Sequence, residues 1–156
     1  MRHTIKILAL VLGLGLSACE EPENPSGKFV GTWRATSGTV TTLCPGYEAI
    51  TDPLNGSLTW AVGVSSDLVG TDPGSACPTL ADVNGGTATG LPGQTCSGSD
   101  GAGGVYTVSV TSYTFVVSPD GRTATENQSG TLMAVLDGAT VVCSVNASGS
   151  YQKISN

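Results

Sequence analysis

The chain has 156 residues, of which only 12% are charged, with twelve acidic and six basic side chains. This length suits one domain with its own hydrophobic core. The formal net charge of −6 disfavours binding to nucleic acid or to anionic lipid head groups, because both attract basic surfaces.

The first eighteen residues have the three parts of an export signal. Arg2 and Lys6 give a basic start, an apolar run extends from Ile7 to Leu16, and small residues precede the expected cut. The apolar run is too short for a transmembrane helix, which needs about 20 residues. It ends in Leu16-Ser17-Ala18-Cys19, which resembles the lipobox of bacterial lipoproteins. A plain secretory signal that is cut nearby is the alternative.

The lipobox resemblance implies that Cys19 carries a diacylglyceryl group and that the peptide bond before it is cut. It also implies an acylated new amino terminus, with palmitate as the expected chain. Two or more acyl chains hold a protein stably at a membrane. Glu20 follows the cysteine. In the sorting rule of enteric bacteria Asp at this position favours the inner membrane, so Glu20 favours the outer one. We therefore expect a cell-envelope protein that reaches its membrane through the lipid on Cys19.

Removal of residues 1–18 changes the charge and the chemistry of the chain. It takes away His3, the only histidine, and two of the six basic residues, which leaves four basic and twelve acidic side chains and a formal charge of −8. Residues 19–27 have two prolines and, after Cys19, no apolar side chain, so we predict a flexible, solvated tether. The folded β domain is predicted to span residues 28–156.

Four cysteines remain after Cys19, an even number in a chain bound for an oxidising compartment, so we predict two disulfides. Four cysteines allow three pairings. We favour Cys77–Cys96, which closes a local Gly/Pro-rich segment, and Cys44–Cys143, which joins an early strand to a late one. A zinc site is not expected, because the sequence has no Cys-x-x-Cys spacing and no histidine after the signal.

Short Val/Thr-rich runs separated by Gly, Pro, Asn and Asp recur after residue 28, which predicts an all-β fold. Hairpins are expected at Asn84-Gly85-Gly86, between Val117 and Thr123, and at Asp137-Gly138-Ala139. Such a single antiparallel meander forms either a closed barrel or a two-sheet sandwich. Trp33 and Trp60 share strand parity with apolar neighbours, so both are predicted to lie in the core.

Residues 91–104 consist largely of glycine and small polar residues. We predict an exposed loop there, held by Cys96. A calcium site around Asp100 is not expected, because the evenly spaced acidic ligands of such sites are missing.

Gly31-Thr32-Trp33 opens the first predicted strand and resembles the Gly-x-Trp element of lipocalins. That family consists of eight-stranded barrels that carry small apolar ligands. Two other positions depart from its pattern, since Pro73 follows Thr71-Asp72 in place of an aromatic and Lys153 stands in place of an arginine. The resemblance therefore indicates a strand topology and does not indicate a ligand.

The residues after the signal disfavour the usual enzyme mechanisms. No imidazole is left for Ser-His-Asp or Cys-His catalysis, and the sequence has neither a Gly-x-Ser-x-Gly element nor a phosphate-binding loop. Two-carboxylate catalysis is the remaining option. The candidate carboxylates are Glu48, Asp52, Asp67, Asp72, Asp82 and Glu126. Asp52 and Asp72 adjoin prolines and Glu126 is predicted on a solvent face, so we expect no enzyme activity, metal or cofactor.

The sequence supports two functions. The first is a lipid-anchored structural or interaction module of the cell envelope, whose partner is an envelope protein or the wall polymer. The alternative is a lipocalin-like binder of a small apolar ligand. A dry cavity of roughly several hundred Å³ would favour the binder. A core packed solid by Trp33, Trp60, Phe115 and the valines would contradict it.

Overall fold

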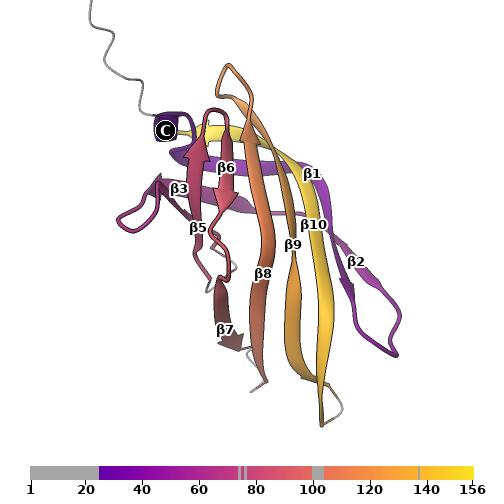
Figure 1. The fold of residues 1–156 in the computed structure, drawn as a ribbon. Coiled ribbons are helices and arrows are strands. Elements are labelled where there is room, and N and C mark those ends of the chain that lie inside the picture. Colours follow the sequence, from indigo (N-terminus) through magenta and orange to yellow (C-terminus); the bar gives the residue numbers. More distant parts are fainter. Residues whose placement is uncertain (1–24, 74, 76, 100–103, 137) are drawn as a thin grey trace, which may run out of the picture.

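The computed structural model describes residues 25–73, 75, 77–99, 104–136 and 138–156. These residues form a short 3-10 helix, η1 (Pro25–Lys28), followed by β-strands (Figure 1). The ten described strands are β1 (Gly31–Leu43), β2 (Ile50–Pro53), β3 (Ser57–Val62), β4 (Leu68–Thr71), β5 (Thr79–Asn84), β6 (Thr87–Gly90), β7 (Thr95–Ser99), β8 (Val105–Val117), β9 (Thr123–Leu136) and β10 (Ala139–Ser155).

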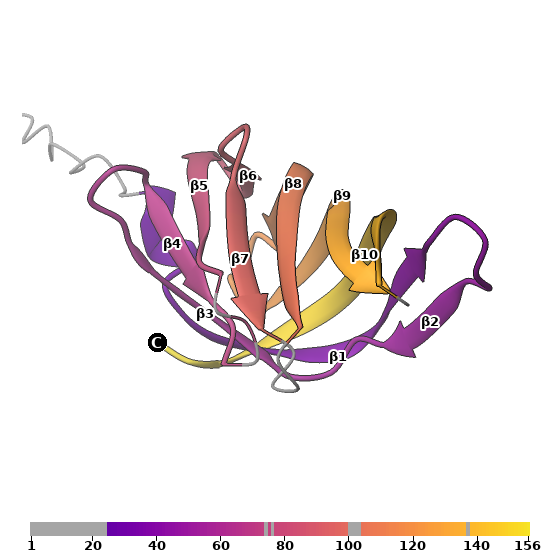
Figure 2. The same ribbon diagram turned by 90° about the horizontal axis from the view of Figure 1, so that it is seen from below.

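Eight of the ten described strands close into one antiparallel barrel. Around the barrel the order is β1, β3, β4, β5, β6, β8, β9 and β10, and β10 pairs with β1 to complete the ring. β2 extends the sheet along β1, and β7 extends it along β8 (Figures 1 and 2). The predicted all-β meander is confirmed, and of the two predicted architectures the barrel is the one observed.

The predicted hairpins are also confirmed, and their turns set the strand register. In the β8–β9 hairpin, Val117 pairs with Ala124 and Phe115 pairs with Glu126. Gly121 in this turn has a φ of 69°, a left-handed conformation that glycine adopts without steric cost. Because side chains alternate between the two faces of a strand, this register decides which residues of β9 face the barrel interior.

An aromatic core closes one end of the barrel. The rings of Trp33, Trp60 and Phe115 are buried, and the centroid of Phe115 lies 5.3 Å from that of Trp33 and 5.8 Å from that of Trp60. Phe29, which follows η1, is buried as well, and its carbonyl oxygen accepts a 2.7 Å hydrogen bond from Trp33 Nε1. Each aromatic pair contributes about 0.5–1.5 kcal/mol beyond its buried area. The predicted core positions of both tryptophans are confirmed.

The structure corrects the exposed loop predicted for residues 91–104, because Thr95–Ser99 forms β7 and pairs with β8. β6 pairs with β8 only at Thr114, Phe115 and Val116, near the C-terminal end of β8. The rest of this edge of β8 therefore has backbone N–H and C=O groups that can pair with another strand. Gly98 lies opposite Tyr106, where a Cβ would collide with the tyrosine ring. Strand propensity misses this segment because pairing depends on a partner edge distant in sequence. Asp100 lies outside the described residues.

The described chain begins with η1, which includes residues 25–27 of the predicted tether. Ser26 is buried, and its carbonyl oxygen accepts hydrogen bonds from the N–H groups of Phe29 (3.0 Å) and Val30 (3.3 Å). These bonds fix residues 25–27 to the buried Phe29, which the local composition does not reveal. The predicted signal (residues 1–18), Cys19 and the rest of the predicted tether up to residue 24 lie outside the described residues. No helix within the described part of the chain is long and apolar enough to cross a membrane.

Candidate functional site

A cavity of about 450 Å³ lies inside the barrel, next to the aromatic core. Its position follows from the inward-facing residues of β8. Phe115 and Val117 belong to the core only, Tyr113 belongs to the core and also lines the cavity, and Val110 and Val108 continue the cavity lining. One half of the long strand therefore packs a solid interior, and the other half encloses a space.

The cavity wall formed by β1, β8 and β10 is apolar. It contains Val40, Val108, Val110, Val145 and Ala147. These side chains are small compared with the rings of the aromatic core, so they do not fill the interior. The wall can therefore contact the hydrocarbon part of a ligand without offering it a hydrogen bond.

Another part of the cavity wall comes from the connections that follow β2 and β4. Leu54 belongs to this wall and packs over two glycines, since a Cβ on Gly38 or on Gly149 would meet its Cδ2 atom. Gln94 fastens the connection before β7 by accepting a 2.6 Å hydrogen bond from Leu80 N–H and donating to the carbonyl oxygens of Leu80 (2.8 Å) and Leu91 (2.9 Å). These contacts hold the otherwise irregular wall against β5.

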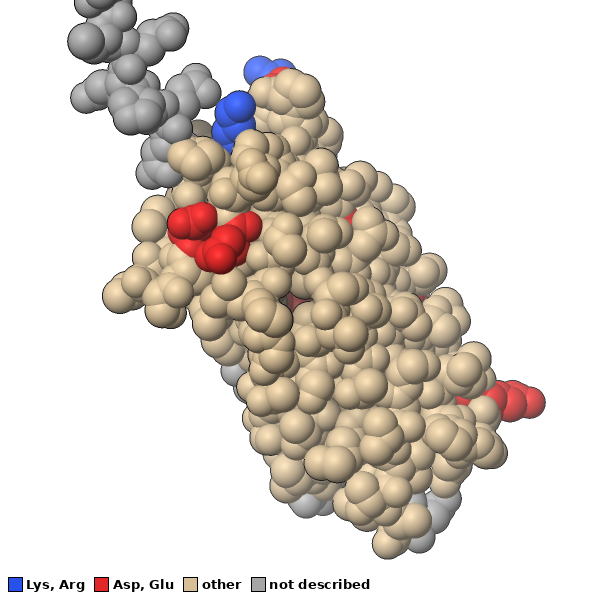
Figure 3. Space-filling view, in the orientation of Figure 1, with Lys and Arg blue, Asp and Glu red and all other residues tan. Residues whose placement is uncertain are grey.

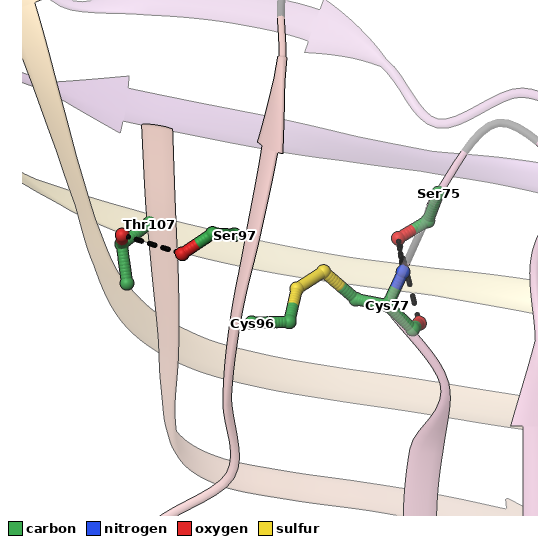
Figure 4. Close-up of a disulfide and its surroundings, with 5 residues drawn as sticks. All are labelled: Ser75, Cys77, Cys96, Ser97 and Thr107. Carbon is green, nitrogen blue, oxygen red and sulfur yellow. Dashed lines mark hydrogen bonds between the residues drawn. A yellow bond between two sulfur atoms is a disulfide. The ribbon is translucent and has the colours of Figure 1, made fainter. Parts of the chain in front are cut away.

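The Cys77–Cys96 disulfide also forms part of the cavity wall. Figure 4 shows it joining β7 to the segment before β5, where the Cys77 N–H donates a 3.1 Å hydrogen bond to Ser75 Oγ. Cys44–Cys143, in contrast, joins the end of β1 to β10 and does not line the cavity among the described residues. Both predicted pairings are confirmed.

The polar floor of the cavity is formed by Glu126 and Tyr151. Glu126 is only 7% exposed, and Tyr151 Oη donates a 2.5 Å hydrogen bond to Glu126 Oε2. Burial raises the pKa of Glu126, and the hydrogen bond from Tyr151 partly opposes this effect. Burial and the neighbouring Glu126 carboxylate raise the pKa of Tyr151. The sequence prediction that Glu126 faces solvent is wrong, because its pairing with Phe115 places it on the inner face of β9.

Tyr113 supplies a second hydroxyl at this floor. It is 3% exposed and lines the cavity, yet its Oη has no hydrogen-bond partner among the described residues. Burial, and then the charge of Glu126, raise the pKa of Tyr113 well above its ordinary value. The Tyr113 hydroxyl also acts to lower the pKa of Glu126, although its placement does not meet hydrogen-bond geometry. Buried hydroxyls nearly always have a hydrogen-bond partner, so a donor or acceptor brought by a ligand would complete this one.

The charged residues around the cavity are all acidic. Asp72 and Glu126 line it, and no Lys, Arg or His is among the described lining residues. Three of the four described basic residues, Lys28, Arg122 and Lys153, instead surround a separate hollow beside the chain end at Asn156. Figure 3 shows that most of one molecular face is uncharged. The acidic lining of the cavity is therefore a local property and does not reflect a generally charged surface.

Of the six carboxylates that the sequence offered as candidates, the structure brings Asp72 and Glu126 to the same cavity. Asp67 is exposed and accepts a 2.8 Å hydrogen bond from Val83 N–H. The remaining three, Glu48, Asp52 and Asp82, are exposed and do not line the cavity. The tyrosines were not predicted as site residues. The β8–β9 turn could have revealed part of the floor, because its register pairs Phe115 with Glu126 and Tyr113 with Gln128.

Within the described residues, no group of three or more His, Cys, Asp or Glu side chains is arranged to hold a metal ion. Protein-family models, curated proteins and solved structures were compared with the chain, and none of them matches it. A function is therefore inferred from the cavity and its lining residues alone.

Proposed function

We propose that this protein binds a small, largely apolar molecule in the barrel cavity. The observation that carries this proposal is a space of about 450 Å³ with a valine-rich wall and a small polar floor. Ligand pockets have volumes of about 300–1,000 Å³ and combine apolar walls with a few placed polar groups. The packed core of Trp33, Trp60 and Phe115 occupies only one end of the barrel, so it does not remove the space that a ligand needs.

The lipocalin resemblance of Gly31-Thr32-Trp33 gains support from the barrel. Eight strands close the ring, as in that family. Lys153, at the position where an arginine was expected, has its ammonium 5.4 Å from the Trp33 ring centroid and donates a 3.2 Å hydrogen bond to the Lys28 carbonyl oxygen. A cation over an indole ring is attracted by its quadrupole. This contact lies at the closed end and leaves the cavity open.

The binder is proposed to be anchored to the outer membrane of a bacterial envelope through the lipid on Cys19. Residues 19–24 would span at most about 20 Å. η1 lies at the closed end of the barrel, so an anchored protein would hold this end near the bilayer and the cavity half away from it (Figure 1). A Cys19→Ala variant should leave the membrane fraction, whereas a Cys77→Ser variant should remain there. Retention of the Cys19→Ala variant at the membrane would contradict lipid anchoring.

An interaction module of the envelope is the second candidate. It is favoured by β2 and β7, which lie at the two edges of the sheet outside the barrel ring. An edge strand can recruit an extended segment of an envelope protein by strand addition. The ligand experiment separates the two candidates, because edge recruitment does not need the cavity.

The test of the binding proposal uses N-phenyl-1-naphthylamine, a neutral apolar probe whose fluorescence rises on leaving water. Purified protein should enhance its emission at a stoichiometry of one site. Ala147→Phe fills the cavity from β10 and should weaken probe binding at least about tenfold, by overpacking. Asn146→Phe is the matched control, because the neighbouring residue is exposed on the outer face. Equal binding by both variants, or no binding by the unaltered protein, would contradict the proposal.

A further inference from the structure

Glu126 is a buried carboxylate without a cationic partner in the described part of the chain. Tyr151 donates a hydrogen bond to its Oε2 atom, whereas an ionised carboxylate has about four acceptor positions. Burying such a group is unfavourable unless it is paired or fully hydrogen-bonded. A positive charge beside Glu126 would therefore stabilise the ionised carboxylate.

Tyr113 gives an independent indication of a ligand at the same place. Its hydroxyl is buried and lacks a hydrogen-bond partner among the described residues, and Tyr113 itself lines the cavity. A hydroxyl oxygen accepts hydrogen bonds as well as donating one, so Tyr113 and Glu126 can both accept from a single donor group. An ammonium carries three donors and no acceptor, which matches this pair of acceptors.

Aromatic rings also line the cavity. Tyr106, Tyr113 and Tyr151 all line the cavity, and its described lining contains no basic side chain that could already lie against their rings. Aromatic faces attract cations, most strongly where water is excluded. The valine-rich wall then remains for the apolar part of the same molecule.

We propose that the cavity selects an apolar amine over a fatty acid, with the ammonium at Glu126 and Tyr113 and the hydrocarbon chain against Val108, Val110 and Val145. This inference rests on the proposed ligand-binding function and specifies its ligand class. A fatty acid of the same length fits the wall equally well. Its carboxylate, however, meets the negative charge of Glu126, with no basic side chain in the described lining to offset the repulsion.

The experiment compares three ligands that share a ten-carbon chain and differ in the head group. Decylamine, 1-decanol and decanoate are each used to displace N-phenyl-1-naphthylamine from the purified protein at neutral pH. Decylamine should displace the probe at a concentration about tenfold or more below that of decanoate, because its ammonium can make charge-assisted hydrogen bonds at the floor whereas the decanoate carboxylate is repelled by Glu126. 1-Decanol should fall between them and reports the contribution of the chain alone.

Two variants assign this selectivity to the floor. Glu126→Gln keeps the shape of the side chain and an acceptor for Tyr151, and it should reduce the preference for decylamine over 1-decanol about tenfold, to near parity. Tyr113→Phe removes a hydroxyl that bonds no described residue and should weaken decylamine binding severalfold with little change for 1-decanol. Asp82→Asn is the control, because it removes one exposed negative charge outside the cavity.

The outcomes separate this inference from the function on which it rests. Displacement by decanoate at the same concentration as decylamine, or at a lower one, would overturn the amine selectivity while leaving apolar binding intact. Equal loss of selectivity in Asp82→Asn and Glu126→Gln would also overturn it, since net charge alone would then explain the preference. Failure to bind the probe contradicts the proposed function itself. If Glu126→Gln does not fold, the ligand series on the unaltered protein and on Tyr113→Phe decides the question.

Discussion

The closed end and the cavity half of this barrel share the same long strands, yet one is solid and the other is hollow. On the inner face of β8, Phe115 and Val117 lie within the aromatic core, whereas Val110, at its border, and Val108 line the cavity. On β10, Tyr151 is followed toward the cavity by Gly149 and Ala147. The two regions differ in side-chain volume rather than in backbone pairing, so one sheet carries a stabilising core and a binding site side by side.

This division assigns different roles to residues that look alike in the sequence. Filling the interior with aromatic rings removes apolar surface from water and adds dispersion contacts. Where valine and alanine line the interior, these contacts are not made and a cavity remains. We therefore expect substitutions at the closed end to act on stability and substitutions in the cavity half to act on binding.

The largest effect is expected from Trp33→Ala. Trp33 is fully buried, contacts the Phe115 ring and donates a hydrogen bond to the Phe29 carbonyl oxygen. Its removal should lower the free energy of unfolding by about 5 kcal/mol, at the upper end of the range for such truncations. Val145→Ala in the cavity wall should lower it by only about 1 kcal/mol, since the lost methyl groups are half-buried. Urea titration followed by tryptophan fluorescence and circular dichroism measures both.

Ligand affinity is the second readout for these variants. Val145→Ala enlarges the cavity and should change the affinity for N-phenyl-1-naphthylamine. The folded fraction of Trp33→Ala, in contrast, should bind the probe with the affinity of the unaltered protein. A Val145→Ala variant as unstable as Trp33→Ala would show that the cavity half is part of the stabilising core. The comparison between the two ends would then fail.

Most of the framework could be predicted from local sequence. The Asp-Gly and Asn-Gly-Gly turns predicted hairpins because their backbone requirements are met by the residues themselves. Trp33 and Trp60 could be placed in the core from strand parity, and the favoured disulfide pairs from spacing and from the expected order of strands. Closure into a barrel needed the pairing of β1 with β10, which are far apart in the chain.

The site was harder to predict because it depends on register across several strands. Glu126 lies between Thr125 and Asn127, a composition typical of a solvent face, but the turn before it aligns it with Phe115. Because paired residues in an antiparallel sheet point to the same face, a core position for Phe115 implies that Glu126 faces the interior as well. Tyr151 reaches the same floor from the C-terminal strand, and no local pattern connects it with Glu126. The formation of β7 likewise depends on a distant part of the chain, because β7 pairs with an edge of β8.

A smaller effect sharpens the comparison from the cavity side, through the pH dependence of stability. Burial raises the pKa of Glu126, with Tyr151, Tyr113 and Asp72 as the titratable groups that act on it. A folded-state pKa above the unfolded value of about 4.3 means that the folded state binds the proton more tightly. The resulting stabilisation is fully present below the unfolded pKa and is lost as the pH rises through the folded pKa. Each unit of difference is worth about 1.4 kcal/mol.

Comparison with Glu126→Gln, whose side chain does not titrate, isolates this contribution. As the pH rises from about 4 toward neutrality, the free energy of unfolding of the unaltered protein should fall relative to that of the variant. A relative rise would mean that the hydrogen bond from Tyr151 outweighs burial and that Glu126 is already satisfied as an anion. Saturating decylamine should remove the fall, because an ammonium at the floor stabilises the ionised carboxylate. The closed end has no comparable group among its described core residues, so this dependence on pH and ligand should belong to the cavity half alone.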